Sequence, residues 1–499
     1  MSRKRYIRIN ESDNVAVALE DLEKGEIITF ISNTFVLTTN VPKGHKFTLE
    51  AVKKGGQVIK YGYPIGYLKH DVLAGTWINE KDINTNLSGI NEYSYQPFPI
   101  SLDIPDKHLT FNGYRRKNNK VGIRNQLFIV PTVGCVNGIV KKLEHIFKTE
   151  ELDNYRNIEA VIALTHSYGC SQLGPDYENT RKILRDITLH PNAGGVLVVG
   201  LGCENNQPKE FKKFLGEYDD ERIKFMICQD TEDEVQEGMK LLKIIAEIIN
   251  HDQREPISLS ELKVGLKCGG SDGFSGITAN PLLGKFSDWL ISQGGTTVLT
   301  EVPEMFGAET ILMNRCKNEK IFQQTVSLIN DFKDYFLSHG EPIGENPSPG
   351  NKAGGISTLE EKSLGCVQKC GKSKISGVLQ YGETLQKKGL YLLSSPGNDL
   401  VSSTALAASG CQIVLFTTGR GTPFGTFVPT VKISTNNILA DNKHSWIDFN
   451  AGVLLEDISE EKVLSSFINK IIQIASGLPT SNEVSGYIDM AIFKNGIIL

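Results

Sequence analysis

Three cysteines close three apolar runs of the sequence, and a glycine precedes each of them. Cys135 ends "NQLFIVPTVGC", Cys170 ends "EAVIALTHSYGC" and Cys203 ends "GGVLVVGLGC". The cysteines are 35 and 33 positions apart, which is the length of one strand–helix unit. Parallel strands bring their C-terminal ends to one edge of a sheet, where ligands bind. We therefore expect the three thiols to lie on one rim, called the thiol rim below.

Three thiolates on one rim would suit a soft metal ion and leave one coordination position open for a substrate. Iron, as a single ion or in an iron–sulfur cluster, fits such ligands. The alternative is that Cys135, Cys170 and Cys203 are small residues packed in turns, because their spacing is no C-x-x-C signature. His166 and Glu204 share the predicted rim, and each is either a proton-transfer group or a hydrogen-bonding part of the scaffold.

Several glycine-rich turns follow predicted strands in the second half of the chain, and their backbone N–H groups could hold an anion. They are "KCGGSDGFSGITANP" (267–281), "GNKAGG" (350–355), "SSPGNDLVSST" (394–404) and "FTTGRGTPFGT" (416–426). None fits a nucleotide-binding signature. Ordinary turn chemistry is the alternative for any single loop, but together they favour a small anionic substrate. The candidate substrate-binding residues are Asp272, Lys352, Asn398 and Arg420, of which Arg420 offers a bidentate grip on a carboxylate.

Two further candidates lie near the N-terminus. His45 belongs to "GHK" and Lys60 to "IKYGYPIG". A lone histidine is more often structural, and a lysine on a strand more often faces solvent. Both nevertheless stay candidates for proton transfer.

The elements that must position these residues indicate a mixed fold. Residues 1–95 predict a small all-β domain, with short strands at 14–19, 26–30, 34–39 and 56–62 separated by turn residues. Residues 96–108 predict a linker. Residues 109–252 alternate between strands and helices and predict a middle α/β domain with a mainly parallel sheet. Its expected strands are 126–132, 160–166 and 195–201, and its expected helices are 138–150, 177–188, 208–216 and 233–251.

The same alternation over residues 253–499 predicts a C-terminal α/β domain, joined to the middle domain by a polar, proline-bearing segment at 252–261. Expected strands are 262–268, 296–301, 390–394, 411–417 and 430–434, and expected helices are 281–293, 319–337, 375–387, 400–409 and 459–476. Residues 339–373, rich in glycine, proline and charge, predict a long functional loop.

The bulk properties exclude several protein classes. The chain has 499 residues, a formal net charge of -5 and nine cysteines. This charge disfavours a general nucleic-acid binder, and no apolar run approaches the length of a membrane span. The first residues lack the apolar stretch of a secretory signal. We expect a cytoplasmic enzyme without disulfides; whether it forms a homo-oligomer stays open.

Several long motifs of the sequence resemble the altronate/galactarate dehydratase family. They include "GYRRKNNKVGIRNQLFIVPTVGCVNGI", "THSYGCSQLG", "GLGCENNQ", "CGGSDGFSGITANP", "TEVPEMFGAETILM", "GNKAGGISTLEEKSLGC" and "FTTGRGTPFGTFVPTVKI". The resemblance runs from about residue 5 to the C-terminus. It implies an N-terminal SAF (β-clip) domain followed by two α/β domains.

The resemblance also implies a metal-dependent hydro-lyase. The expected reaction converts D-altronate to 2-dehydro-3-deoxy-D-gluconate in hexuronate catabolism, with galactarate or another sugar acid as the alternative substrate. The implied metal is iron, or else Mn²⁺ or another divalent cation, and we place it at the thiol rim. Dehydration needs a base for the C2 proton and help for the departing C3 hydroxyl. His166 is the preferred base, with Lys60 and His45 behind it, and Arg420 is expected to bind the substrate carboxylate.

One stretch departs from the family pattern. Relatives carry a histidine-rich run at the end of the SAF domain, where this chain has "WINEKD" (77–82). Asn79, Glu80 and Asp82 would be the replacements if those histidines bind metal, and their oxygens would favour a harder cation. A catalytically silent sugar-acid binding protein is therefore the alternative of another class. An oxidoreductase that uses a nicotinamide is disfavoured by the absent dinucleotide fingerprint.

Overall fold

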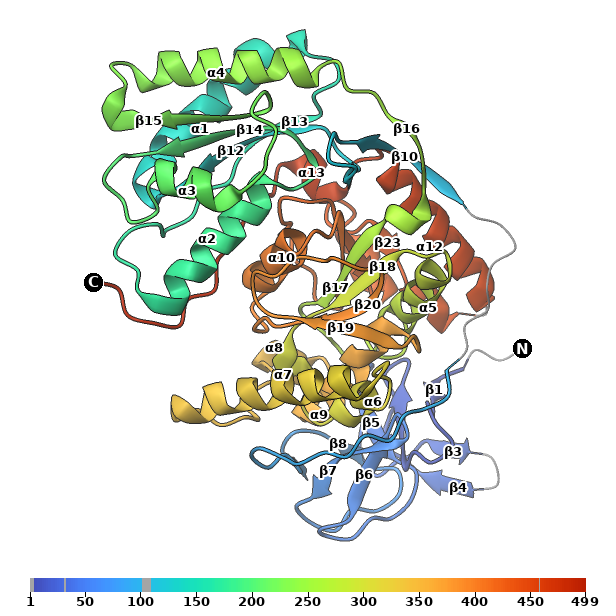
Figure 1. The fold of residues 1–499 in the computed structure, drawn as a ribbon. Helices are drawn as coiled ribbons and strands as arrows, with labels where there is room; N and C mark the ends of the chain where they lie inside the picture. The colour runs from blue at the N-terminus through green and yellow to red at the C-terminus, as the bar shows by residue number, and fades with distance from the viewer. Residues whose placement is uncertain (1–3, 31–32, 101–108, 457) are drawn as a thin grey trace.

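The computed structural model describes residues 4–30, 33–100, 109–456 and 458–499. Figure 1 shows a small β domain (blue), an α/β domain at the opposite end (cyan and green), and a larger α/β domain between them (yellow to red). This arrangement confirms the predicted fold class. Most of the predicted linker, residues 101–108, lies outside the described residues.

The N-terminal domain consists of short antiparallel strands in three small sheets. Their orders are β1-β2-β5-β8, β3-β4 and β6-β7-β9. The strands are β1 (Tyr6–Ile7), β2 (Val15–Ala18), β3 (Ile27–Phe30), β4 (Asn33–Val36), β5 (Lys46–Thr48), β6 (Gln57–Lys60), β7 (Tyr63–Leu68), β8 (Trp77–Ile78) and β9 (Ile83–Asn84). The short β5 and β6 carry Lys46 and Lys60 to the domain's inner side, where both side chains are buried.

The middle domain has a parallel sheet of order β13-β12-β14-β15. Its strands are β12 (Gln126–Pro131), β13 (Ala160–Ala163), β14 (Ala193–Gly200) and β15 (Ile223–Ile227), and its helices are α1 (Asn137–Ile146), α2 (Gly174–Thr188), α3 (Pro208–Leu215) and α4 (Glu234–Ile249). Alternate residues of a strand face opposite sides of a sheet. Leu127 and Ile129 accordingly pack towards α1 and α4, whereas Phe128 and Val130 pack towards α2 and α3.

The C-terminal domain has a parallel sheet of order β19-β20-β18-β17-β21-β22-β23. The strands are β17 (Lys263–Cys268), β18 (Thr296–Leu299), β19 (Ile375–Leu379), β20 (Gly389–Leu393), β21 (Ile413–Thr418), β22 (Thr430–Ser434) and β23 (Phe449–Asn450). The helices are α5 (Ala279–Ser292), α6 (Glu309–Met313), α7 (Glu319–Ser338), α8 (Pro349–Ala353), α9 (Leu359–Cys366), α10 (Asp399–Ala408), α11 (Asn437–Asn442), α12 (Glu460–Ala475) and α13 (Ser481–Ser485).

Three sequence-based predictions about elements are wrong. The expected helix 375–387 begins instead with β19, an edge strand that pairs with β20. The expected loop 339–373 contains α8 and α9, whose N-caps are Ser348 and Thr358. The expected polar join 252–261 contains β16 (Glu255–Ser258), which pairs antiparallel with β10 (Thr110–Arg115); β10 also pairs with β11 (Val121–Gly122). Partner strands and caps, rather than local composition, decide the structure of these segments.

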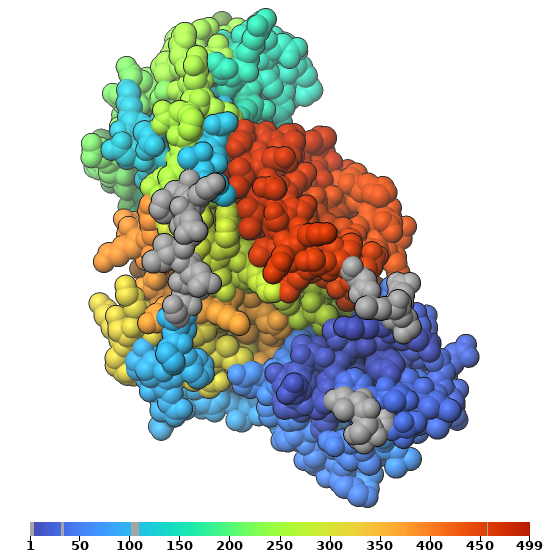
Figure 2. All heavy atoms as spheres, turned by 90° about the vertical axis from the view of Figure 1, so that its right-hand side faces the viewer, coloured from blue at the N-terminus to red at the C-terminus, as the bar shows by residue number. Residues whose placement is uncertain are grey.

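The domains share apolar cores. One cluster joins Val58, Ile65 and Leu68 of the N-terminal domain to Leu359 and Leu364 of α9. A second cluster continues from the face of the middle sheet that α2 covers to α10 of the C-terminal domain. The space-filling view shows the N-terminal and middle domains at opposite ends of the C-terminal domain (Figure 2). None of the helices within the described residues is long and apolar enough to cross a membrane.

Candidate functional site

The thiol rim lies on the middle domain. Cys135 sits in a short 3₁₀ helix directly after β12, and Cys170 and Cys203 sit in the loops after β13 and β14. All three are exposed free thiols. Gly169 and Gly202 have positive φ angles of 102° and 128°, so they allow turns that an L-residue would strain. Three neighbouring strands thus each end near one cysteine.

The thiol rim does not form a compact site for a single ion. Throughout the described part of the chain, three His, Cys, Asp or Glu ligand atoms lie mutually within 4.8 Å only at Cys268, Glu304 and Cys366. The sulfurs of Cys135, Cys170 and Cys203 are therefore more widely spread. Exposed cysteines on separate loops suit an iron–sulfur cluster, which spans more space than one ion. Metal binding by the thiol rim stays a prediction.

His166 and Glu204 hold the turns of this rim in place. Tyr168 N donates to His166 Nδ1 (3.1 Å), and His166 Nε2 lies 2.9 Å from Pro131 O. Burial lowers the pKa of His166 to about 4, so the ring is neutral and donates its Nε2–H to that carbonyl. Both oxygens of Glu204 accept backbone N–H groups of its own turn, at 3.1 and 2.6 Å. Both ring nitrogens of His166 are used by these bonds in this structure, and its role as the base stays a prediction.

The predicted substrate-binding residues lie together at the C-terminal edge of the large sheet. Arg420, after β21, donates its backbone N–H to Gly270 O after β17 (3.0 Å). Asn351 of α8, beside Lys352, donates its side-chain N–H to Ser271 O (2.8 Å). The two loops and α8 therefore form one rim, at the edge where parallel sheets bind ligands.

Arg420 and Lys352 remain available to a ligand. Arg420 is exposed and Lys352 half-buried. Within the described residues, neither side chain forms a hydrogen bond or an ion pair. Asn398 is also exposed, but its Oδ1 caps α10 by accepting from Leu400 N and Val401 N, both at 3.1 Å. Two free cations at one sheet edge suit an anionic substrate.

Asp272 organises this edge and does not face a ligand. Its buried carboxylate accepts hydrogen bonds from Ser275 Oγ (3.0 Å), Thr435 Oγ1 (2.9 Å) and Asn436 Nδ2 (3.0 Å). Burial raises the pKa of Asp272 despite these bonds. The prediction that Asp272 binds substrate is corrected, because its oxygens are already used to tie the loop after β17 to the loop after β22.

The N-terminal domain contributes two lysines that share one carboxylate. Lys46 Nζ and Lys60 Nζ lie 2.8 and 2.7 Å from opposite oxygens of Glu361 on α9, and all three side chains are 1% exposed. Burial lowers the pKa of Lys46, whereas for Lys60 Glu361 outweighs burial and raises the pKa. Lys60 is therefore held as a cation in an interdomain joint, and its predicted role as a base is corrected. Sequence reasoning missed Lys46.

His45 lies in the same interface. Its Nε2 is 3.3 Å from Ala353 O of α8, and its Nδ1 accepts the indole N–H of Trp77 (3.2 Å). Burial and the charge of Lys46 lower the pKa of His45. The ring is therefore neutral and anchors α8 to the N-terminal domain. Trp77, the first residue of "WINEKD", thereby orients the His45 ring that contacts α8.

The rest of that stretch forms a local turn. Asp82 Oδ2 accepts from Asn79 N (2.9 Å), and Asn79 Oδ1 accepts from Lys81 N (2.8 Å). Both side chains are thereby used by the turn between β8 and β9, and neither belongs to the compact ligand group named above. Metal binding by Asn79, Glu80 and Asp82 stays a prediction.

A dense cluster of charges, buried except for Asp399, lies beneath the edge of the large sheet and was missed by the sequence-based predictions. Its acidic and basic members are Lys267, Glu301, Glu304, Lys362, Lys369 and Asp399, and its thiols are Cys268 and Cys366. Lys369 Nζ lies 2.8 Å from Cys268 Sγ, and Lys362 Nζ lies 2.7 Å from Glu304 Oε1. We call these eight residues the buried cluster. A sequence signal existed, since "TEVPE" places two acids directly after a buried strand.

Glu301 is the most unusual residue of the buried cluster. It is fully buried and has a left-handed backbone with φ 69°. Such backbone strain in a non-glycine residue concentrates at functional sites. Glu301 Oε2 accepts from Cys268 N (2.9 Å), while Oε1 lies 3.3 Å from Lys267 Nζ without a hydrogen bond. Burial and Glu304 raise the pKa of Glu301, whereas Lys362 and Lys369 outweigh burial at Glu304 and lower its pKa to about 2.

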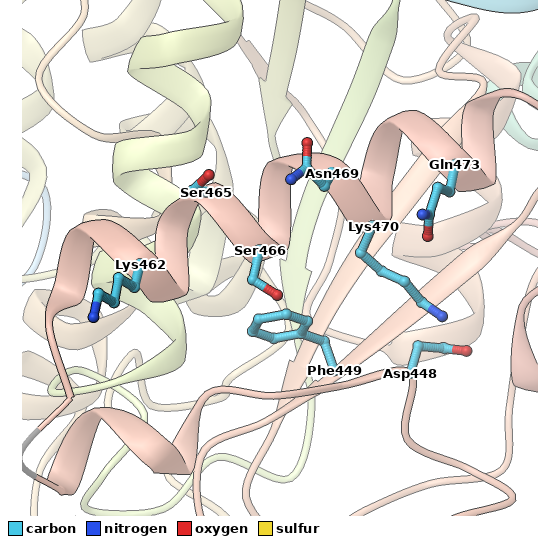
Figure 3. Close-up of a pocket in the computed structure, with 8 residues that line it drawn as sticks. All are labelled: Asp448, Phe449, Lys462, Ser465, Ser466, Asn469, Lys470 and Gln473. Carbon is cyan, nitrogen blue, oxygen red and sulfur yellow. The ribbon is translucent and has the colours of Figure 1, made fainter.

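A separate surface groove follows α12. Figure 3 shows its polar lining, with Lys462 and Lys470 on the helix and Asp448 and Phe449 across from them. It contains none of the residues described above. Because its lysines extend from an outer helix and no strained or buried group accompanies them, we do not assign the active site to this groove.

The chain matches three family models. They are described as "Altronate/galactarate dehydratase SAF domain" over residues 4–86, "D-galactarate dehydratase/Altronate hydrolase, second domain" over residues 113–250, and "D-galactarate/Altronate dehydratase, C-terminal" over residues 259–498.

Curated relatives match over nearly the whole chain. Altronate dehydratase from Bacillus subtilis (strain 168) is 55% identical over 497 residues, which cover 99% of this chain and 100% of the relative. Altronate dehydratase from Escherichia coli (strain K12) is 53% identical, with 99% and 100% covered. Galactarate dehydratase (L-threo-forming) from Escherichia coli (strain K12) is 34% identical, with 95% and 93% covered.

Proposed function

Since this chain belongs to the D-galactarate/altronate dehydratase family and is a sugar-acid dehydratase, we propose that its substrate is D-altronate. The product would be 2-dehydro-3-deoxy-D-gluconate, in hexuronate catabolism. The observation that carries this proposal is the full-length identity of 55% to an altronate dehydratase, against 34% to a galactarate dehydratase. Galactarate is the second candidate substrate.

The free cations of the sheet edge are proposed to bind the substrate. Arg420 would grip the C1 carboxylate through two parallel N–H···O bonds, and Lys352 would add a second positive charge. The loop of Arg420 is fixed by the hydrogen bond from its backbone N–H to Gly270 O, and α8, which carries Lys352, is fixed by the bond from Asn351 to Ser271 O. A rigid frame of this kind holds the C2–C3 bond in one orientation over the edge of the sheet.

Glu301 is proposed to move the proton. In the elimination, Glu301 would take the C2 hydrogen as a proton, and the electron pair of that C–H bond would form the C2–C3 double bond. The C3–O bond would break as the hydroxyl takes this proton back from the Glu301 carboxyl group and departs as water. The resulting enol loses the proton of its C2 hydroxyl, gains one at C3 and becomes the 2-keto acid. A buried carboxylate in a strained backbone, with one oxygen lacking a hydrogen bond, can accept the first proton once the edge opens to substrate.

An iron cofactor belongs to the same proposal. Cys135, Cys170 and Cys203 would hold it, as an iron–sulfur cluster or Fe²⁺, with Mn²⁺ or another divalent cation as the alternative. Such a cofactor, when bound, would supply Lewis-acid polarisation of the substrate's oxygens. The exposure of the three thiols on neighbouring strand ends supports this proposal.

An anaerobic assay with added Fe(II) tests the substrate by following 2-keto acid release from D-altronate and from galactarate. We expect a higher kcat/KM for D-altronate. Faster turnover of galactarate would reverse the assignment. Binding of either acid without turnover in iron-replete protein would instead favour a silent binding protein.

The Glu301→Gln variant tests proton transfer. General-base catalysis contributes about 10²–10⁴ to the rate, so kcat should fall by about that factor while KM changes little. The matched control is Glu360→Gln, another buried glutamate, whose Oε1 accepts from Thr85 and Asn86. If Glu301→Gln loses no more activity than Glu360→Gln, Glu301 does not transfer the proton.

A further inference from the structure

Three ligand atoms of the buried cluster form a small triangle. Glu304 Oε2 lies 3.0 Å from Cys268 Sγ and 3.1 Å from Cys366 Sγ, and the two sulfurs are 3.3 Å apart. Cys268 ends β17, Glu304 lies in the 3₁₀ helix Val302–Met305 after β18, and Cys366 ends α9. Three segments far apart in the sequence therefore place two thiol sulfurs and one carboxylate oxygen next to one another.

The triangle is deeply buried, and hydrogen bonding alone accounts for it poorly. Cys268, Glu304 and Cys366 are 1%, 4% and 3% exposed. Both thiols lie within reach of the same carboxylate oxygen and of each other, although S–H is a weak donor. Lys362, on the other oxygen of Glu304, keeps this carboxylate charged, so an anionic oxygen lies between two thiols.

The charges around the triangle allow a dication. The ammonium groups of Lys267, Lys362 and Lys369 match the carboxylates of Glu301, Glu304 and Asp399, so the buried cluster is neutral while its thiols are protonated. A divalent ion that displaces two thiol protons leaves this balance unchanged. Lys369, 2.8 Å from Cys268 Sγ, would donate to the resulting thiolate.

We propose that Cys268, Glu304 and Cys366 bind one divalent transition-metal ion of borderline softness, such as Fe²⁺ or Zn²⁺, at a site distinct from the thiol rim. An ion about 2.3 Å from each sulfur and about 2.1 Å from the oxygen would sit just above the triangle, after its corners spread by roughly half an ångström. Two thiolates disfavour Mg²⁺ and Ca²⁺. Three protein ligands leave a fourth position open, next to the glycines that follow β17.

This inference goes beyond the proposed dehydration, and its test measures metal binding instead of turnover. The background is the full-length chain with Cys135→Ser, Cys170→Ser and Cys203→Ser, exposed positions whose replacement removes the thiol rim as a competing site. The metal-free, reduced variant is titrated with Co²⁺, whose bonds to thiolates give an intense near-ultraviolet charge-transfer band. We expect one Co²⁺ per chain and this band. A folded background variant without the band would overturn the proposal.

Substitutions within the triangle then identify the ligands. Cys268→Ser and Cys366→Ser should each weaken the band, and Glu304→Gln, which keeps the side chain's shape, should lower Co²⁺ affinity at least about 100-fold. Cys411→Ser, a buried thiol elsewhere in the same domain, is the matched control and should bind Co²⁺ like the background. A band of full intensity and unchanged affinity in Glu304→Gln, or in either serine variant, would place the ion elsewhere and refute the site.

Discussion

Replacing Glu361 by glutamine should destabilise the contact between the N-terminal domain and α9 more than replacing either Lys46 or Lys60, the two lysines that it binds. Glu361 accepts from Lys46 (2.8 Å), Lys60 (2.7 Å) and Ser357 N (2.7 Å). Without the carboxylate, two buried ammonium groups face each other with no counter-charge. Removing one partner of a buried ion pair costs about 3–5 kcal/mol.

The Lys46→Met variant should cost much less. It leaves Lys60 and Glu361 as a balanced pair and removes only the lysine's hydrogen bonds, among them one to Gly355 O at 3.1 Å. Such bonds contribute about 1–2 kcal/mol together. The two variants differ in cost because the joint contains two cations and one anion. Removing one cation leaves a balanced pair, whereas removing the anion leaves two unpaired cations.

Hydrogen exchange of the backbone amides in β5 and β6 measures the difference. A cost of about 3–5 kcal/mol corresponds to roughly 10²- to 4 × 10³-fold faster exchange in Glu361→Gln. Lys46→Met should accelerate it about tenfold. The control is Lys53→Met, which removes an exposed ion pair with Asp71 and should change little. If Lys46→Met accelerates exchange as much as Glu361→Gln, the charge argument fails.

Three further predictions concern substrate binding and pH. Arg420→Gln should raise KM for the sugar acid about 10–100-fold, because the substrate loses a charged hydrogen-bonding partner, and kcat should change little. An unaltered KM in steady-state kinetics would show that Arg420 does not bind the substrate. Burial lowers the pKa of His166 to about 4 and of His190 to about 3, so the unfolded chain takes up protons first and stability should fall as the pH drops below about 6.5. Urea unfolding at several pH values tests this, and His190→Gln should flatten the dependence. Burial raises the pKa of Asp186 from 3.8 to about 7, so stability should fall as the pH rises from about 4 to 7 and level off above 7. Asp186→Asn should raise the melting temperature more at pH 8.5 than at pH 5, and an equal rise at both would contradict the assignment.

The sequence predicted best those features that depend on local pattern. Short apolar runs that end in glycine, such as those before Cys135 and Cys203, favour buried strands, and the alternation of strand and helix then indicates parallel sheets. The edge occupied by Arg420 and Lys352 followed from the same argument. By contrast, β19 was predicted as a helix because its five residues have no clear period, and only pairing with β20 makes them a strand.

Burial and backbone strain could not be predicted from the sequence. Lys46 and Lys60 both lie on short strands and look alike in the chain, yet burial lowers the pKa of Lys46, whereas Glu361 outweighs burial and raises the pKa of Lys60. The left-handed backbone of Glu301 has no local signature, since glycine or asparagine would normally occupy such a position. The internal bonds of His166 likewise depend on carbonyl groups from another strand.

The missed helix α9 explains most of what the site predictions lacked. A threonine followed three residues later by glutamate is a helix-start signature, and "TLEE" contains it at Thr358 and Glu361. Once α9 is helical, Glu361 near its start faces the lysines of the N-terminal domain, while Cys366 at its end reaches Glu304. The interdomain joint and the buried triangle are therefore opposite ends of one short helix. Any displacement of the N-terminal domain that moves Glu361 must also shift Cys366, so the joint positions the buried cluster.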